Sequence, residues 1–118
     1  MILTDIEAKL KELDENVYYG MVDESQSEMK WNYTVFNRRI VRPSANKTAA
    51  SDYFDVHIIR ENYIPEGLDA EYITQLCKLP GVRLAGEDCQ FNYAQKPKTN
   101  IVVEMLTIPF VRARKANV

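Results

Sequence analysis

The residues that could carry out chemistry are few in this sequence and widely spaced. His57 is the only histidine. Together with Cys77 and Cys89 it lacks the close sequence spacing that the ligands of a zinc or di-iron site have. Activation of a serine or cysteine nucleophile would also require His57, and neither cysteine lies in a recognisable nucleophile setting. We therefore expect a structural histidine, two buried and unreactive cysteines, and no metal or cofactor.

Carboxylates are the other candidates, because a pair of them could act in acid–base catalysis or bind magnesium. The possible members are Glu61, Glu66, Asp69, Glu87 and Asp88. Nothing in their spacing selects such a site over solvated loop charge, and the four glycines form no phosphate-binding motif. We expect that the protein is not an enzyme.

Basic side chains gather at two places in the sequence, where they could contact a protein partner or phosphate. The first group is Arg38, Arg39, Arg42 and Lys47, and the second is Arg112, Arg114 and Lys115. Residues 1–30 are net acidic, whereas residues 31–60 and 98–118 are net basic. This alternation favours a subunit whose acidic and basic faces meet neighbouring copies; chance clustering of solvated charge is the alternative.

Aromatic residues lie close to the first basic group. Trp31, Tyr33 and Phe36 could stack on nucleic-acid bases. Their alternation with polar residues is typical of a half-buried strand, so we expect them to fill the core face of that strand instead.

The composition is typical of one soluble domain over residues 1–118. With 46% hydrophobic and 27% charged residues, the chain is long enough to bury a single core. No apolar run approaches the roughly 20 residues that a membrane helix needs. The N-terminal sequence lacks the pattern of a signal peptide, so we expect folding in the cytosol.

Hydrophobic periodicity predicts an α+β fold. A capping box at Thr4 and Glu7 predicts a first helix that stops near residues 15–16, and Asp69 is expected to cap a second helix that ends at Pro80. Strand-like segments are residues 17–22, 31–36, 39–42, 52–63, 82–93 with a break at 86–88, and 100–115. We expect two helices on one mainly antiparallel sheet of four to five strands, in the order α-β-β-β-α-β-β.

A projecting β-hairpin is the most distinctive expected feature. Asn37 and Arg38 favour a tight turn, and residues 43–51, which lack periodicity, are expected to form a mobile loop. The last strand is apolar on both faces, which predicts a place well inside the sheet. Pro109 cannot donate a ladder hydrogen bond, so we expect it at a bulge or where one neighbouring strand has ended.

Four stretches of the sequence resemble small proteins of tailed phages and prophages of Gram-positive bacteria, encoded between the capsid and the major tail protein. These stretches are residues 17–20 (VYYG), 31–36 (WNYTVF), 60–67 (RENYIPEG) and 104–115 (EMLTIPFVRARK). The expected element order is also similar to that of the tail terminator, or tail-completion, proteins of this group. The resemblance implies no catalytic residue.

What the resemblance implies is a structural subunit. Six copies would form a ring that caps the tail tube, stops its polymerisation and joins the tail to the head. The hairpin and loop over residues 37–51 would reach a neighbouring copy or the tube, and the terminal strand with Arg112, Arg114 and Lys115 would cross a subunit boundary.

The partners implied are copies of the protein itself, the major tail protein and the head connector or head-completion protein, with genomic DNA passing through the ring. The location implied is the neck of a virion that assembles in the bacterial cytoplasm. Two alternatives stay open. One is another neck, head-completion or tail-assembly position in the same particle, and the other is a nucleic-acid-binding module that uses the basic hairpin.

Overall fold

The computed structural model describes residues 2–20, 32–44 and 49–115. Within these residues it contains two helices and one six-stranded mixed sheet, so the protein belongs to the α+β class, as predicted. The elements are α1 (Ile2–Leu13), β1 (Val17–Tyr19), β2 (Tyr33–Pro43), β3 (Ala49–Glu61), α2 (Leu68–Leu76), β4 (Val82–Leu84), β5 (Gln90–Gln95) and β6 (Val102–Lys115).

Three long antiparallel strands form the centre of the sheet. β3 pairs with β2 on one side, and on the other side it pairs with β6 along all 13 of its residues. β1 lies parallel to β2 on its outer edge, while β5 and β4 pair one after the other with the outer edge of β6. β6 is therefore an interior strand, as its two apolar faces predict.

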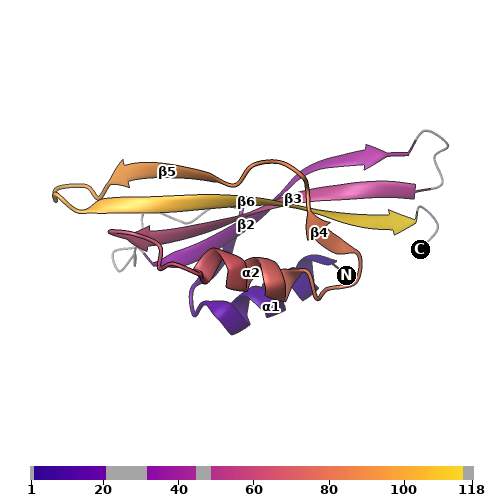
Figure 1. Ribbon diagram of the computed structural model, residues 1–118, viewed down its shortest axis with the longest axis horizontal. Helices are drawn as coiled ribbons and strands as arrows, with labels where there is room; N and C mark the ends of the chain where they lie inside the picture. Colours follow the sequence, from indigo (N-terminus) through magenta and orange to yellow (C-terminus); the bar gives the residue numbers. More distant parts are fainter. Residues whose placement is uncertain (1, 21–31, 45–48, 116–118) are drawn as a thin grey trace.

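Both helices pack on the same face of the sheet (Figure 1). Ile6 and Leu10 of α1 lie four residues apart and so share one side of that helix. They are buried against the sheet together with Tyr72 and Leu76 of α2. Strand alternation supplies the other side of this core, and its members are Phe36, Phe54, Val56, Ile58, Leu106, Ile108 and Phe110. Each buried aliphatic side chain contributes roughly 1.5–3 kcal/mol to folding.

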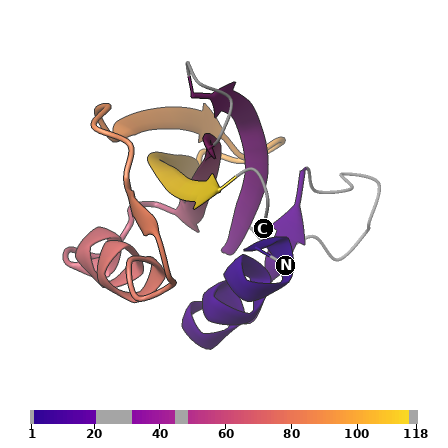
Figure 2. The same cartoon turned by 90° about the vertical axis from the view of Figure 1, so that its right-hand side faces the viewer.

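The opposite face of the sheet is strongly curved. Seen along its long axis, the sheet has β5 above β6 and β2 at its side (Figure 2). The side chain of Arg39 on β2 forms an ion pair with Glu87, which lies between β4 and β5, so the two halves of the sheet approach each other across this face. A second apolar cluster lies here and contains Tyr33, Val35, Ile59 and Val103.

The predicted turn at Asn37 and Arg38 is wrong. β2 continues to Pro43 with a bulge between Arg38 and Ile40, and Ala49 already pairs as the first residue of β3. The chain reverses over residues 45–48, which lie outside the described residues. Asn37 stays extended because its side chain contacts His57 on the neighbouring strand instead of forming a local turn.

The helix ends also differ from the predictions. α1 begins at Ile2, so Thr4 lies inside its first turn and is not the cap. The residue that caps α2 is Gly67, in a left-handed conformation with a φ of 89°, and Asp69 lies in the first turn, where a negative charge is favourable. α2 ends at Leu76, before Pro80, because the backbone continues with tighter bonds between residues three apart.

Residues 82–93 form two strands instead of one broken strand, which makes the sheet six-stranded and adds a final β to the expected order. β5 pairs with β6 from Val102 to Thr107, and β4 pairs with it from Phe110 to Arg112. Pro109 lies in the interval between the two partners, where no ladder bond from its nitrogen is needed, and this confirms its predicted place. Its carbonyl accepts a hydrogen bond from the Ala85 N–H at 3.0 Å.

Candidate partner interface

The central sheet extends past the helices at one end of the molecule, which measures 53 × 28 × 24 Å (Figure 1). We call this part the arm, and it consists of residues 38–43 of β2, 49–54 of β3 and 110–115 of β6. All the described residues among the predicted partner contacts lie on the arm. Lys47 and the side chain of Lys115 lie outside the described part of the chain.

Two arginines of the arm lie on the curved face of the sheet that carries no helix. The guanidinium carbons of Arg39 and Arg42 lie 5.2 and 5.1 Å from the centre of the Tyr53 ring, within the range of a cation–π contact. Arg39 also forms ion pairs with Asp55, at 3.3 Å, and with Glu87. Arg39 is therefore largely neutralised within its own chain, whereas no carboxylate of the described residues is paired with Arg42.

The other three arginines of the arm point to the face on which the helices pack. Arg38 Nε donates to the Tyr19 hydroxyl at 3.0 Å. Arg112 Nε donates to the Pro80 carbonyl at 3.4 Å, and Arg114 Nε lies 2.9 Å from an Asp52 carboxylate oxygen. The two basic groups of the sequence thus come together on one arm, but they are divided between its two faces and do not form one continuous basic patch.

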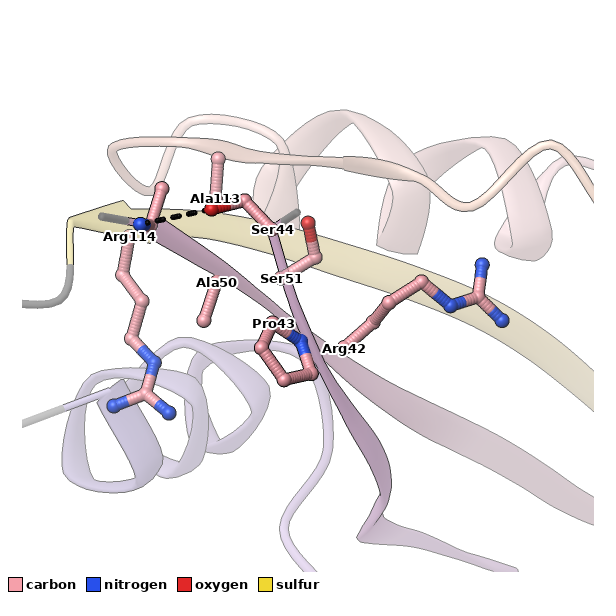
Figure 3. Close-up of a pocket in the computed structure, with 8 residues that line it drawn as sticks. Arg42, Pro43, Ser44, Ala50, Ser51, Ala113 and Arg114 are labelled. Carbon is pink, nitrogen blue, oxygen red and sulfur yellow. Dashed lines mark hydrogen bonds between the residues drawn. The ribbon is translucent and has the colours of Figure 1, made fainter. Parts of the chain in front are cut away.

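A shallow hollow of about 460 Å³ lies at the tip of the arm (Figure 3). Its lining consists of Arg42, Pro43, Ser44, Ala49, Ala50, Ser51, Ala113 and Arg114. The hollow exists because the side chains between the strands are small, and the side chains of Arg42 and Arg114 extend from it in opposite directions (Figure 3). Small-molecule sites have converging polar groups, so this hollow is better suited to a partner side chain.

The arm also exposes apolar side chains and part of a strand edge. Ile40 and Val41 are 41% and 53% exposed and, as consecutive residues of one strand, they point to opposite faces. In the described part of the chain, β1 pairs only with Thr34 to Phe36, and no strand pairs with the outer edge of β2 beyond Phe36. Exposed apolar groups beside such an edge are typical of a surface that meets another protein.

His57 lies in a row of polar side chains on the curved face. Its Nε2 lies 2.7 Å from Asn37 Oδ1, and its Nδ1 lies 2.8 Å from Thr107 Oγ1. A neutral ring satisfies both contacts if Nε2–H donates to Asn37 and Nδ1 accepts from Thr107. Burial lowers the pKa of His57, and the negative charge of Asp55 partly opposes this shift.

Neither cysteine is buried, so the expectation that they lie in the core is wrong. Cys77 follows the last turn of α2, Cys89 precedes β5, and both are free and exposed. Partial burial of the Cys89 sulfur nevertheless raises the pKa of this thiol, and the negative charges of Asp69 and Asp88 raise it further. A thiol with a raised pKa is a poor nucleophile at neutral pH.

No metal centre emerges from the described residues, among which no three His, Cys, Asp or Glu side chains are grouped so that they could hold an ion. The candidate carboxylates lie apart: Glu61 pairs with Lys96 at 2.9 Å, and Glu87 pairs with Arg39. Glu87 and Asp88 line a groove of about 260 Å³ on the curved face, next to Arg39 and Thr107. Glu61 and Glu87 therefore take part in ion pairs within the chain.

An exposed aromatic surface that the sequence patterns do not predict lies at the other end of the molecule. Around the turn between β5 and β6, four large apolar side chains are exposed, and we call this surface the hairpin end. Its members are Tyr63 (70% exposed), Phe91 (51%), Tyr93 (64%) and Val102 (45%). Tyr93 lies opposite Glu104, and a hydrogen bond to that carboxylate raises the pKa of Tyr93. The alternation of residues 90–95 predicts a strand but not that both of its faces are exposed.

Comparison with known proteins adds no relative: no family model matches the sequence, and no curated protein matches it. Among the described residues, no helix is long and apolar enough to cross a membrane.

Proposed function

We propose that this protein is a structural subunit of a phage neck, which assembles into a ring, caps the tail tube and joins the tail to the head. The arm is the observation that carries the proposal. It extends past the helices, exposes Ile40 and Val41 on its two faces, and has a strand edge without a described partner. A monomer gains nothing from such a surface, whereas a subunit can bury it against a neighbour.

The capping mechanism follows from asymmetry between the two faces of a ring. A ring adds to a growing tube when one face reproduces the docking surface of the tube. Growth stops after one layer if the opposite face does not reproduce it. Contacts between different surfaces of identical subunits close into such a ring when the rotation from one copy to the next divides a full turn.

The distribution of charge on the arm supports a protein partner more than nucleic acid. Arg39 and Arg114 are paired with carboxylates of their own chain, and Arg38 and Arg42 point to opposite faces. Phosphate binding depends on several unpaired cations on one face, because each neutralised phosphate adds to the affinity. A protein surface needs only a few anchors around an apolar centre.

The test is assembly, with and without tail tubes. Light scattering over a range of concentrations gives the mass in solution, and electron microscopy with purified tail tubes shows whether the protein decorates tube ends. We expect Val41→Asp to abolish both, since it places a charge on the apolar arm, whereas Thr74→Asp, which adds the same charge to the exposed side of α2, should change neither.

Two outcomes would count against the proposal in different ways. A protein that remains monomeric and never binds tube ends is not a tail cap. Assembled rings that bind a head connector but not tubes would assign the protein to another position in the neck.

A further inference from the structure

Charges of opposite sign predominate at the two ends of the molecule. At the arm, residues 38–43 contain three arginines and no carboxylate, and the one carboxylate of residues 49–54, Asp52, is paired with Arg114. The other end has the reverse character. Residues 61–67, which follow β3, contain no lysine or arginine, and they carry two carboxylates, Glu61 and Glu66.

Cations near the hairpin end do not cancel this charge. Lys96 is held by Glu61 at 2.9 Å, which leaves Lys98 as the remaining lysine in the β5–β6 turn. Glu66 and Glu104 outnumber Lys98 on this part of the surface, and neither has a described ion pair. The hairpin end is therefore acidic around its aromatic centre.

The aromatic side chains of the hairpin end come from two segments that a hydrogen bond joins. A carboxylate oxygen of Glu104 accepts the backbone N–H of Ile64 at 2.8 Å, and the same residue lies opposite Tyr93 in the β5–β6 pair. Glu104 thus joins the segment that carries Tyr63 to the strand that carries Tyr93. Exposed aromatic groups with a polar surround resemble the centre and rim of a protein–protein contact.

From these observations we infer that the arm of one copy docks on the hairpin end of the next copy. Val41 contacts the aromatic surface formed by Tyr63, Phe91, Tyr93 and Val102, and Arg38, which lies on the same face of the arm and has no described ion pair, faces the carboxylates around it. The inference rests on the proposed function only in requiring that copies assemble, and it identifies the surface on which the arm docks.

A head-to-tail contact is favoured over a symmetric one for two reasons. A symmetric pair of arms would bring the Arg38 side chains of both copies close to each other, and like charges in an interface are unfavourable. The arm and the hairpin end also lie at opposite ends of the long axis (Figure 1), so that each copy keeps one surface of each kind available for a further neighbour. Such a contact continues from copy to copy until the ring closes.

Cross-linking between two single-cysteine variants tests this contact. In a background in which both exposed native cysteines are serine, Val41→Cys and Tyr93→Cys are made in separate proteins of different mass and then mixed. Residues in contact react as if at a very high local concentration. We expect about tenfold more 41–93 product than product between Glu12→Cys and Tyr93→Cys, because Glu12 lies on the exposed side of α1.

The outcomes separate the inference from the proposed function. Dominant 41–41 product would mean a symmetric contact and would overturn the inference. Assemblies detected by light scattering that give no 41–93 product would overturn it as well. If the protein neither assembles nor decorates tail tubes, the proposed function fails together with the inference.

A second variant tests the docking surface without a cross-link. Tyr93→Ser removes an aromatic group that is 64% exposed, so the fold should be retained, and self-association should weaken about tenfold. The control is Glu12→Ser, which changes an exposed side chain of α1, outside both the arm and the hairpin end, and should leave the association constant unchanged. Equal weakening by both variants would contradict the inference.

Discussion

Asp14 is the residue that fastens the end of α1 to the sheet. Its side chain is 8% exposed, and one carboxylate oxygen accepts from Thr34 Oγ1 at 2.9 Å and pairs with Arg60 at 3.0 Å. The other oxygen accepts the backbone N–H of Asn16 at 3.0 Å, and the Thr34 hydroxyl also contacts the Tyr72 hydroxyl at 2.7 Å. In this network each buried polar group has a hydrogen-bond or charge partner. Loss of one member therefore leaves another without its partner and reduces the stability of the fold.

Removal of Asp14 should therefore destabilise the protein strongly. Asp14→Ala leaves Arg60, which is 15% exposed, without its charge partner, and we expect a loss of about 3 kcal/mol in the free energy of unfolding. Urea unfolding followed by circular dichroism measures it. In the control, Glu12→Ala removes an exposed pair with Lys9 and should cost no more than about 0.5 kcal/mol. Equal effects of the two variants would mean that the buried pair is not important for stability.

His57 predicts a pH dependence with a definite sign. Its pKa is lowered in the folded protein because burial disfavours the charged ring, so near pH 6.5 the unfolded chain binds more protons than the folded one. The free energy of unfolding should fall as the pH falls below about 6.5, until the folded pKa is passed. Nearby carboxylates also titrate on this side of neutrality, so the quantity to measure is the difference between the wild type and His57→Gln in urea unfolding at several pH values. A constant difference would contradict the prediction.

At the level of elements, the connection between α2 and β4 depends on Gly81. This residue has a φ of +78°, and a Cβ placed there would lie 3.1 Å from the backbone oxygen of Ala113 on β6. The Ala113 N–H in turn donates to the Gly81 carbonyl at 3.3 Å. The turn can follow β6 this closely only because glycine has no side chain.

Gly86 offers a matched comparison for Gly81, because it has a similar φ of +83° but nothing within 4 Å of an added Cβ. Gly86→Ala should cost about 1 kcal/mol from the left-handed conformation alone. Gly81→Ala should cost about 1–3 kcal/mol more, because the added atom meets backbone that cannot move aside easily. Thermal or urea unfolding gives both values, and similar losses in the two variants would show that the close approach to β6 is not needed.

For the whole molecule, opposite charges at its two ends predict that salt weakens assembly. The arm is basic and the hairpin end is acidic, and screening between exposed charges increases as the Debye length falls from about 10 Å at 0.1 M salt to about 3 Å at 1 M. Light scattering over this range should show the assembly constant falling, and Arg38→Gln should reduce the salt dependence. Assembly that strengthens with salt would indicate that apolar contacts act alone.

The sequence predicts local features of this structure better than features that depend on contacts between distant segments. The α+β class, the interior place of β6 and the site of Pro109 follow from local patterns, because alternation and proline chemistry act within one strand. The turn at Asn37 was predicted wrongly because the partner of its side chain, His57, lies on another strand. The exposure of Cys77 and Cys89 and the aromatic hairpin end depend on which faces the helices cover, and periodicity does not contain that information.

The candidate interface was located in part. The sequence indicates that the two basic groups lie on projecting strands, and the structure brings Arg38, Arg39, Arg42, Arg112 and Arg114 to one arm. The place of Arg42 on the curved face depends on the bulge between Arg38 and Ile40, which shifts the alternation by one residue. Pairing with Asp52 and Asp55 depends on strand register, which sequence alone does not determine.

The place of β6 in the sheet has a consequence for biosynthesis. β3 and β5 both pair with β6, yet β6 follows them in the chain, and about fifty residues separate the end of β3 from the end of β6. At a translation rate of roughly 5–20 residues per second, the 13-residue edge of β3 waits several seconds on the ribosome for its partner. During that interval this edge of β3 is unpaired, and only finished chains have the three-stranded arm that can join another copy.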